Sequence, residues 1–288
     1  QWHMIRPQGD DWKLPMSRTR VLALRRVVRV VVLAYFVALA GVFMLQDKLL
    51  YFPQRVSVGE IVQPGLAAWP SAGDFRGLIA EPPAAITVRG TVIVFHGNAG
   101  HAADRRYYAD ALTAQGLRVV LAEYPGYGPR DGTPSEAQLV SDAAASIALV
   151  QQTYGAPLLV IGESLGAGVA AAATAKLKNQ SFALLLITPW DTLANVAAYH
   201  YPWLPVRWIV GDAYNNVANV QQMTWPLMVV VAERDSIVPA RFGIALYETS
   251  KVPRRLVEIP GAEHNDWSEQ IDADWWRNAL AFLLPSSP

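Results

Sequence analysis

The chain has 288 residues, of which 52% are apolar and 17% charged, and its 24 basic and 24 acidic side chains cancel. This composition excludes a disordered chain, and the length suits one domain of roughly 200–250 residues with an appendage. Residues 48–288 hold 17 basic against 21 acidic residues, which leaves no basic footprint for nucleic acid. The absence of cysteine excludes disulfides, thiol catalysis and zinc–thiolate sites.

The first 26 residues form a basic N-terminal arm, whose first three residues precede a methionine and have the character of a cloning remnant. Residues 27–47 follow and contain an uncharged apolar run of 16 residues, Val30–Leu45, which Arg29 extends by reaching toward lipid headgroups. Basic residues cluster before this run, whereas Asp47 and Lys48 after it cancel. The positive-inside rule then predicts a single-pass membrane anchor with a cytoplasmic N-terminus and a periplasmic or extracytoplasmic catalytic domain.

Two other interpretations of the apolar stretch stay open. Ala38-Leu39-Ala40 resembles the cleavage site of a secretory signal peptide, although the apolar run continues beyond it. A buried helix of a soluble protein could also be this apolar, although the arginine cluster argues against burial. Ala34 and Ala38, four residues apart, could form a close helix–helix contact, so a homodimer through the membrane helix is one partner considered.

After residue 48 the sequence predicts a single catalytic domain, 48–288, that begins with antiparallel strands in the proline- and glycine-rich stretch 48–85. Beyond it, continuous apolar runs alternate with helical stretches, which predicts parallel strands covered on both faces. The expected strands are 91–95, 117–122, 157–161, 183–187, 227–231 and 255–259. The expected helices are 102–115, 135–154, 165–178, 241–250 and 265–283, with Thr133 and Glu136 as a capping box for the second. This alternation predicts a doubly wound, mostly parallel α/β sheet.

The segment Gly162-Glu163-Ser164-Leu165-Gly166 lies between an expected strand and a helix of small residues. In this context a G-x-S-x-G serine sits on a sharp turn that projects its hydroxyl above the sheet, and the glycines let the backbone pack closely. The N-terminus of the following helix favours negative charge at the same place. Ser164 is therefore the predicted nucleophile, and the alternative is an ordinary glycine-rich turn.

A serine nucleophile needs a base, normally histidine, that is oriented by a carboxylate. In the chain order serine, acid, histidine, His264 follows the last expected strand and is the predicted base. Asp235 follows the strand before it and is the predicted acid. Asp191, one strand earlier, is the rival, and either aspartate could instead cap a loop.

An oxyanion hole requires two backbone N–H groups aimed at the developing negative charge. Leu165, directly after the serine, is predicted to supply one, and Asn98, in the glycine loop 96–100 after the strand 91–95, the other. His96 is expected to support this loop by hydrogen bonding rather than to take part in catalysis. The competing interpretation of the loop is a helix-opening turn.

The segments HGNAG, YPGYGPRDGTPSE, GESLGAG, AERDSIVP, ALYE and GAEHND together resemble the membrane-anchored alpha/beta-hydrolase-domain proteins of the bud-emergence type. QDKLLYFP and YPWLP are similar too, so the resemblance covers about residues 30–270. It implies the α/β-hydrolase fold, a single-pass anchor, a triad of Ser164, Asp235 and His264, and activity on acyl esters or thioesters. Two departures, Pro125 and the VAERD segment, leave the triad untouched.

Residues 188–225 are expected to form a short aromatic cap. Trp190, Tyr199 and Trp203 are candidates for lining a substrate pocket, although the aromatic residues could equally rest at the bilayer interface or pack on the sheet. The leading prediction is a membrane-anchored serine hydrolase of carboxylic esters or thioesters with short-to-medium acyl chains, including lipids or phospholipids. The alternatives are a serine peptidase acting on small peptides and a non-enzymatic hydrolase-fold scaffold. Neither a cofactor nor a metal ion is expected.

Overall fold

The computed structural model describes residues 18–177, 182–211 and 213–284, the side chain of Val21 excepted. Most of the predicted N-terminal arm, residues 1–17, and the predicted last residue of the third helix, Lys178, lie outside these residues. The chain divides into two compact units, Gln1–Leu45 and Gln46–Pro288. The division into arm, anchor and catalytic domain remains a proposal.

The first unit contains one long helix, α1 (Arg18–Leu50), which continues through its last five residues into the second unit. An 18-residue window of α1 reaches a mean hydropathy of 2.4 and has no buried residue. Among the described residues it is the one helix long and apolar enough to cross a bilayer. The helix begins before the expected anchor because the arginine and leucine residues ahead of the apolar run are good helix formers.

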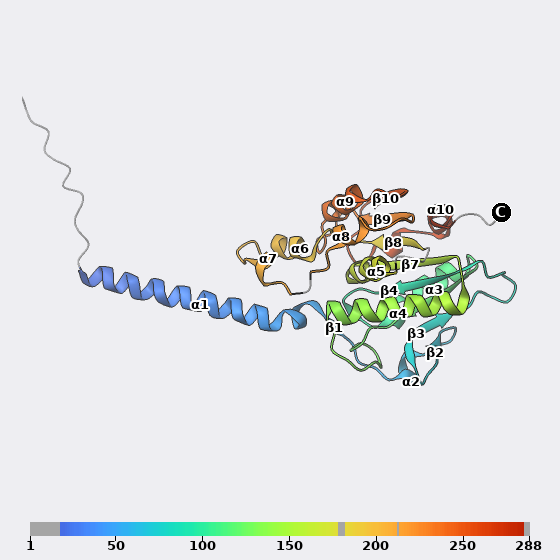
Figure 1. Ribbon diagram of the computed structural model, residues 1–288, viewed down its shortest axis with the longest axis horizontal. Helices are drawn as coiled ribbons and strands as arrows, with labels where there is room; N and C mark the ends of the chain where they lie inside the picture. Colours follow the sequence, from blue (N-terminus) through green and yellow to red (C-terminus); the bar gives the residue numbers. More distant parts are fainter. Residues whose placement is uncertain (1–17, 178–181, 212, 285–288) are drawn as a thin grey trace, which may run out of the picture. The chain divides into compact units, whose positions relative to one another are not determined.

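The second unit is organised around an eight-stranded sheet with the order β10-β9-β8-β7-β4-β6-β3-β2 (Figure 1). Neighbouring strands are parallel from β10 to β6, and β3 and β2 extend the sheet antiparallel. The parallel strands are β4 (Gly90–Phe95), β6 (Leu117–Ala122), β7 (Leu158–Glu163), β8 (Ala183–Ile187), β9 (Leu227–Ala232) and β10 (Arg254–Ile259). They lie where the apolar runs predicted them, so the doubly wound, mostly parallel sheet is confirmed.

The early strands follow the prediction in part. β2 (Ala67–Pro70) and β3 (Phe75–Ala80) are antiparallel, as expected for the stretch 48–85. β1 (Phe52–Pro53) differs, because it pairs in parallel with β5 (Ala99–Gly100) in a separate two-stranded sheet. This short pairing fastens the start of the domain to the glycine loop that follows β4.

Helices cover both faces of the large sheet (Figure 1). Alternate side chains of β4 show why its apolar run is continuous: Ile93 and Phe95 face one core, whereas Val92 and Val94 face the other. The first core is closed by α4 (Glu136–Tyr154), α5 (Leu165–Lys176) and α9 (Ala240–Thr249), and the second by α3 (Arg106–Thr113) and α10 (Ala273–Leu283). The second unit therefore has a three-layer α/β/α architecture.

Two expected helices are interrupted. The stretch 102–115 starts as a 3₁₀ turn, η1 (Ala102–Arg105), before α3, and the stretch 265–283 contains η2 (Trp267–Gln270) before α10. Asp272 starts α10 as its N-cap, because its side chain accepts a hydrogen bond from the Trp275 N–H at 2.8 Å. The remaining described helices are α2 (Val58–Ile61) and, between β8 and β9, α6 (Leu193–His200), α7 (Val206–Ile209) and α8 (Asn216–Val220).

The expected capping box at the start of α4 is wrong. Ser135, not Thr133, is the N-cap, and its hydroxyl accepts from the Gln138 N–H at 3.3 Å. Glu136 is thus the first residue of the helix, whereas a capping-box carboxylate belongs at the third. Its carboxylate instead accepts from the backbone N–H groups of Ala213 at 2.6 Å and Tyr214 at 3.0 Å, which fastens the segment before α8 to α4.

Candidate active site

Ser164 stands on the turn between β7 and α5 with φ 53° and ψ −115°. For a residue other than glycine such a conformation costs about 1–3 kcal/mol, so the surroundings must hold it. A Cβ atom on Gly162 would lie 2.3 Å from the Gly166 oxygen, and one on Gly166 would lie 2.0 Å from the Phe95 oxygen. No side chain fits at either position. The two glycines therefore permit the close packing that the strained serine requires.

The side chains of Ser164, His264 and Asp235 form a continuous hydrogen-bonded series. The Ser164 Oγ lies 2.9 Å from His264 Nε2, and His264 Nδ1 lies 2.6 Å from Asp235 Oδ2. An ionised carboxylate only accepts, so Nδ1 carries the proton and Nε2 is left to accept from the serine hydroxyl. The other Asp235 oxygen accepts from the N–H groups of Ile237 at 2.9 Å and Val238 at 2.6 Å. These bonds fix the carboxylate, whose side chain is 1% exposed.

The rival acid, Asp191, is occupied elsewhere. One of its carboxylate oxygens accepts from the Thr192 N–H and the other from the Asn195 side-chain amide, both at 2.6 Å. These contacts lie at the start of α6 and have the character of a loop cap. The structure therefore brings Asp235, and not Asp191, to His264.

The glycine loop after β4 lies against the serine, as the oxyanion hole requires. A Cβ atom on Gly97 would be only 3.7 Å from the Ser164 Cβ. Across the described part of the chain, neither the Asn98 nor the Leu165 backbone N–H donates a hydrogen bond to another protein group. Two free donors beside the nucleophile suit a developing oxyanion, so the assignment of Asn98 and Leu165 stays a prediction with compatible geometry.

Asn98 is anchored through its other polar groups. Its side-chain amide donates to the Leu50 oxygen at 2.9 Å. Its carbonyl oxygen accepts from the Phe52 N–H at 2.9 Å and from the Tyr127 hydroxyl at 2.8 Å. The strand β1 and the loop after β6 thus fix the orientation of this residue.

His96 supports the same loop. The ring is buried, with Nδ1 2.7 Å from the Gly97 oxygen and Nε2 3.0 Å from the Glu123 carboxylate. The Tyr124 hydroxyl donates to the His96 carbonyl at 2.7 Å. Each ring nitrogen thus faces one oxygen atom, of the Gly97 carbonyl or of the Glu123 carboxylate, and these contacts fix the orientation of the ring. These contacts are those of a supporting residue, as the sequence predicted.

The comparisons with known proteins agree with this fold. The family model described as "Serine aminopeptidase, S33" matches residues 86–218. An uncharacterized protein of Mycobacterium tuberculosis (strain CDC 1551 / Oshkosh) is 34% identical over 284 residues, which cover 93% of this chain and 97% of that protein. Human protein ABHD12B is 30% identical over 75% of this chain and 69% of its own length. The chain belongs to the α/β-hydrolase superfamily.

Two further similarities agree with an α/β hydrolase of the ABHD group. The lysophosphatidylserine lipase ABHD12 of Danio rerio is 31% identical over 57% of this chain, which spans about half (48%) of that protein. The solved structure of Est1E from Butyrivibrio proteoclasticus has a TM-score of 0.61 at 18% identity and covers 72% of this chain and 94% of that chain. The resemblance predicted from the motifs is confirmed.

One cluster of this α/β hydrolase was missed by sequence reasoning. Glu163, directly before the serine, accepts hydrogen bonds from Arg105 at 3.0 Å, from the Tyr108 hydroxyl at 3.0 Å and from the Tyr107 hydroxyl. Burial, reinforced by the charge of Glu163, raises the pKa of Tyr107 far above its usual range, so this phenol stays protonated and donates. The available signal was the carboxylate itself, because a charge at the end of a buried strand needs partners.

The predicted pocket residues have different surroundings. Trp190 is buried and its indole N–H donates to the Tyr214 oxygen at 3.2 Å, so it packs within the core. Tyr199 and Trp203 are 47% and 63% exposed. Tyr199 packs under the Arg241 guanidinium at 4.5 Å. The role of these three residues in a substrate pocket stays a prediction. For Trp190, the contacts support the alternative that the side chain packs against the sheet.

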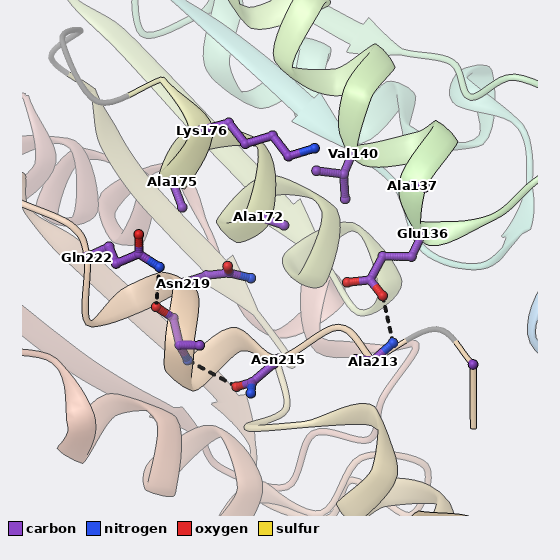
Figure 2. Close-up of a pocket in the computed structure, with 12 residues that line it drawn as sticks. Glu136, Ala137, Val140, Ala172, Ala175, Lys176, Ala213, Asn215, Asn219 and Gln222 are labelled. Atoms are coloured by element: carbon purple, nitrogen blue, oxygen red, sulfur yellow. Dashed lines mark hydrogen bonds between the residues drawn. The ribbon is translucent and has the colours of Figure 1, made fainter. Parts of the chain in front are cut away.

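The largest of the described cavities does not lie at the serine. It measures about 590 Å³ and is lined by residues of α4, α5 and α8, including Glu136, Ala172, Lys176 and Asn219 (Figure 2). Ala172 is two turns of α5 beyond Ser164, which corresponds to about 12 Å along the helix. None of the three predicted pocket residues lines it. Its size therefore says nothing about the substrate of Ser164.

Proposed function

We propose that this chain is a membrane-anchored serine hydrolase that cleaves carboxylic esters or thioesters through an acyl-enzyme on Ser164. The observation that carries the proposal is the hydrogen-bonded series from the Ser164 hydroxyl through His264 to the buried Asp235. The strained serine and the two free N–H donors beside it support the same chemistry.

The first half of the reaction follows from these contacts. His264 Nε2 takes the hydroxyl proton as Ser164 Oγ attacks the acyl carbonyl carbon. The resulting oxyanion receives hydrogen bonds from the N–H groups of Leu165 and Asn98. Asp235 stabilises the imidazolium that forms and keeps its ring in place. The C–O or C–S bond then breaks, and the imidazolium returns its proton to the leaving alcohol or thiol.

The second half regenerates the enzyme. Water gives a proton to His264 Nε2 and attacks the acyl-enzyme carbonyl, and the same two N–H groups stabilise the second oxyanion. Collapse of this intermediate releases the carboxylic acid, and Ser164 regains its proton from His264. Every step uses groups of this chain and water only.

The acyl substrate is proposed to be lipid-derived. A relative 31% identical to this chain is a lysophosphatidylserine lipase, which supports lipid esters as substrates. The exposed aromatic side chains of the segment between β8 and β9 suit contact with acyl chains or with the bilayer interface. A cap of this length favours short-to-medium acyl chains when the ester is soluble.

A serine peptidase is the second candidate, because the matching family model carries the description of a serine aminopeptidase. The two functions separate in a comparison of p-nitrophenyl esters from C2 to C16 with a series of aminoacyl p-nitroanilides. We expect kcat/KM to be higher for the esters and to rise with chain length until the acyl site is filled, since each buried methylene contributes up to about 0.8 kcal/mol. Faster cleavage of the anilides would contradict the esterase and favour the peptidase.

The anchor and its orientation are part of the proposal. The N-terminus is placed in the cytoplasm and the hydrolase domain on the periplasmic or extracytoplasmic side, since the basic residues of α1 precede its apolar run. The bilayer is then a permanent partner of the chain. A homodimer through the close-packing pair Ala34 and Ala38 belongs to the same proposal.

Membrane insertion predicts the behaviour of the chain during extraction. We expect the full-length protein to sediment with membranes and to resist alkaline carbonate. The double variant Leu33→Asp/Val37→Asp, at exposed positions in the middle of the run, should enter the soluble fraction, because each charge at a helix centre costs about 2.5–3.5 kcal/mol. The matched control is Leu22→Asp/Leu24→Asp, also exposed but outside the run, which should stay in the membrane.

Two results would contradict this part of the proposal. Recovery of full-length wild-type protein in the soluble fraction would contradict the membrane anchor. N-terminal sequencing that finds a mature chain starting after Ala40 would support the signal-peptide interpretation instead.

A further inference from the structure

A cation lies beside the proposed nucleophile. A Cβ atom placed on Gly97 would be 3.3 Å from Arg105 Nη2 and 3.7 Å from the Ser164 Cβ. Both atoms therefore lie within 4 Å of one point, at the loop that holds the proposed oxyanion donor Asn98. Arg105 ends the short turn η1 that follows this loop. A substrate bonded to Ser164 is thus within reach of the guanidinium.

Glu163 holds the guanidinium by one edge. Its Oε1 accepts a hydrogen bond from Arg105 Nε at 3.0 Å and forms an ion pair with Arg105 Nη2, also at 3.0 Å. Its Oε2 accepts from the hydroxyls of Tyr108, at 3.0 Å, and Tyr107. Trp267, three residues after His264, packs against both tyrosine rings with centroids 5.9 Å apart. The side chain of Arg105 is therefore fixed relative to the nucleophile and to the histidine loop.

Arg105 has more hydrogen-bond donors than the cluster has acceptors for them. Glu163 accepts three hydrogen bonds, from Arg105 Nε and from the two tyrosine hydroxyls, out of the about four that a carboxylate can accept. A guanidinium has five N–H donors, and among the described residues the Arg105 side chain donates one hydrogen bond, from Nε to Glu163. The N–H groups of Nη1 and Nη2 on the edge turned away from Glu163 donate no hydrogen bond to the described residues, and the side chain keeps 18% of its surface exposed. The cluster therefore has room for one more hydrogen-bond acceptor, at the unused N–H groups of Arg105.

The charge of Arg105 persists in this partly buried position. Burial alone would lower its pKa, but the negative charge of Glu163 and the neighbouring groups raise the pKa above its usual range. Arginine is also the side chain best suited to phosphate, because its planar fork donates two parallel hydrogen bonds to two phosphate oxygens. The free edge of Arg105 offers that geometry.

We propose that Arg105 binds a phosphate group on the leaving-group side of the substrate, so that the enzyme prefers acyl esters of glycerophosphate to neutral esters with the same acyl chain. This inference rests on the proposed function. In a 1-acyl glycerophospholipid, three carbons separate the ester oxygen from the phosphate oxygen, which places the phosphate a few ångströms from the scissile bond. Glu163 then acts as a positioning residue that directs the free edge of Arg105 toward the substrate.

The test compares kcat/KM for 1-acyl lysophosphatidylglycerol with kcat/KM for the monoacylglycerol of the same chain. The wild type should favour the lysophospholipid. In the double variant Arg105→Gln/Glu163→Gln, which removes both charges and keeps both side chains polar, the ratio of the two constants should fall by on the order of ten- to a hundredfold, the loss expected for a charged hydrogen bond. Arg105→Lys, which keeps the charge and loses the fork, should give an intermediate ratio.

A neighbouring arginine provides the matched control. Arg106 donates to the Pro64 oxygen and pairs with Asp110 on the surface, so Arg106→Gln should leave the ratio and both rates unchanged. As a probe without an acyl group, sn-glycerol 3-phosphate should inhibit p-nitrophenyl ester hydrolysis competitively in the wild type and lose that inhibition in the double variant.

The outcomes of these experiments distinguish phosphate recognition by Arg105 from a purely structural role of this side chain. Equal losses on both esters, or an unchanged ratio with unchanged inhibition by glycerol 3-phosphate, would overturn the phosphate site while leaving the esterase proposal intact. A wild-type enzyme that hydrolyses neither ester but cleaves the anilides would overturn the proposed function, and the phosphate site would fall with it.

Discussion

Replacement of Ser164 by alanine is expected to abolish labelling by a fluorophosphonate probe and to lower ester hydrolysis by at least on the order of a thousandfold. The probe reacts with a serine only when a base removes its proton, and Ser164 is the serine whose Oγ contacts a histidine nitrogen, at 2.9 Å, in the described part of the chain. The measurement is in-gel fluorescence of the purified protein together with a rate assay on a short p-nitrophenyl ester.

Ser236 serves as the control for this labelling experiment. It directly follows Asp235, but its hydroxyl donates to Glu263 at 3.1 Å instead of to a base. Ser236→Ala should therefore label like the wild type. Labelling that persists in Ser164→Ala would refute the nucleophile assignment. His264→Ala should likewise lose a thousandfold or more in turnover with the fold intact, since the hydroxyl keeps its place but has no acceptor for its proton.

Asp235→Asn is expected to reduce kcat by on the order of a thousandfold or more with little change in folding. The structure gives the reason. The asparagine oxygen can keep the bonds from the Ile237 and Val238 N–H groups, which turns the amide NH₂ toward His264. That NH₂ donates to Nδ1, so the imidazole proton moves to Nε2 and the ring can no longer accept from the serine.

Asp191→Asn is the paired variant for this prediction. Its carboxylate caps the start of α6 and has no contact with His264, so its loss should change the free energy of unfolding by about 1 kcal/mol and leave kcat near the wild-type value. Thermal unfolding and kcat measured on both variants make the comparison. If Asp191→Asn proves the more harmful to kcat, the acid belongs to the earlier strand.

The arrangement of the sheet could be predicted because it depends on patterns that are local in the chain. A parallel strand covered on both faces is apolar along its length. β8 and β9 are apolar at every position, and β4 and β6 are apolar from Val92 and from Val119 onward. The same holds for Ser164, since a strand, a glycine-flanked serine and a helix of small residues are contiguous. His264 and Asp235 were favoured by chain order, because loops at the carboxyl ends of parallel strands meet at one edge. The choice of Asp235 over Asp191 needed the contacts of the folded chain.

Helix starts were less predictable. Thr133 and Ser135 are both good capping residues two positions apart, and local sequence does not distinguish them. Because Ser135 is the N-cap, Glu136 has no capping role. The Glu136 carboxylate instead accepts hydrogen bonds from the N–H groups of Ala213 and Tyr214, more than seventy residues away. A contact of this kind depends on how the elements pack.

The sequence by itself determined the sheet, the strained serine and the order of the proposed triad, because each is written in contiguous residues or in the succession of strands. The tertiary structure alone decided the partners of the charged residues outside the triad. Arg105 and Glu163 are 58 positions apart and Glu123 and His96 are 27 apart, and no local pattern pairs them. A buried charge accepts whatever partner the packed elements bring within about 3 Å, so the partners of Glu163, and the free edge of Arg105 beside Ser164, became visible only in the folded chain.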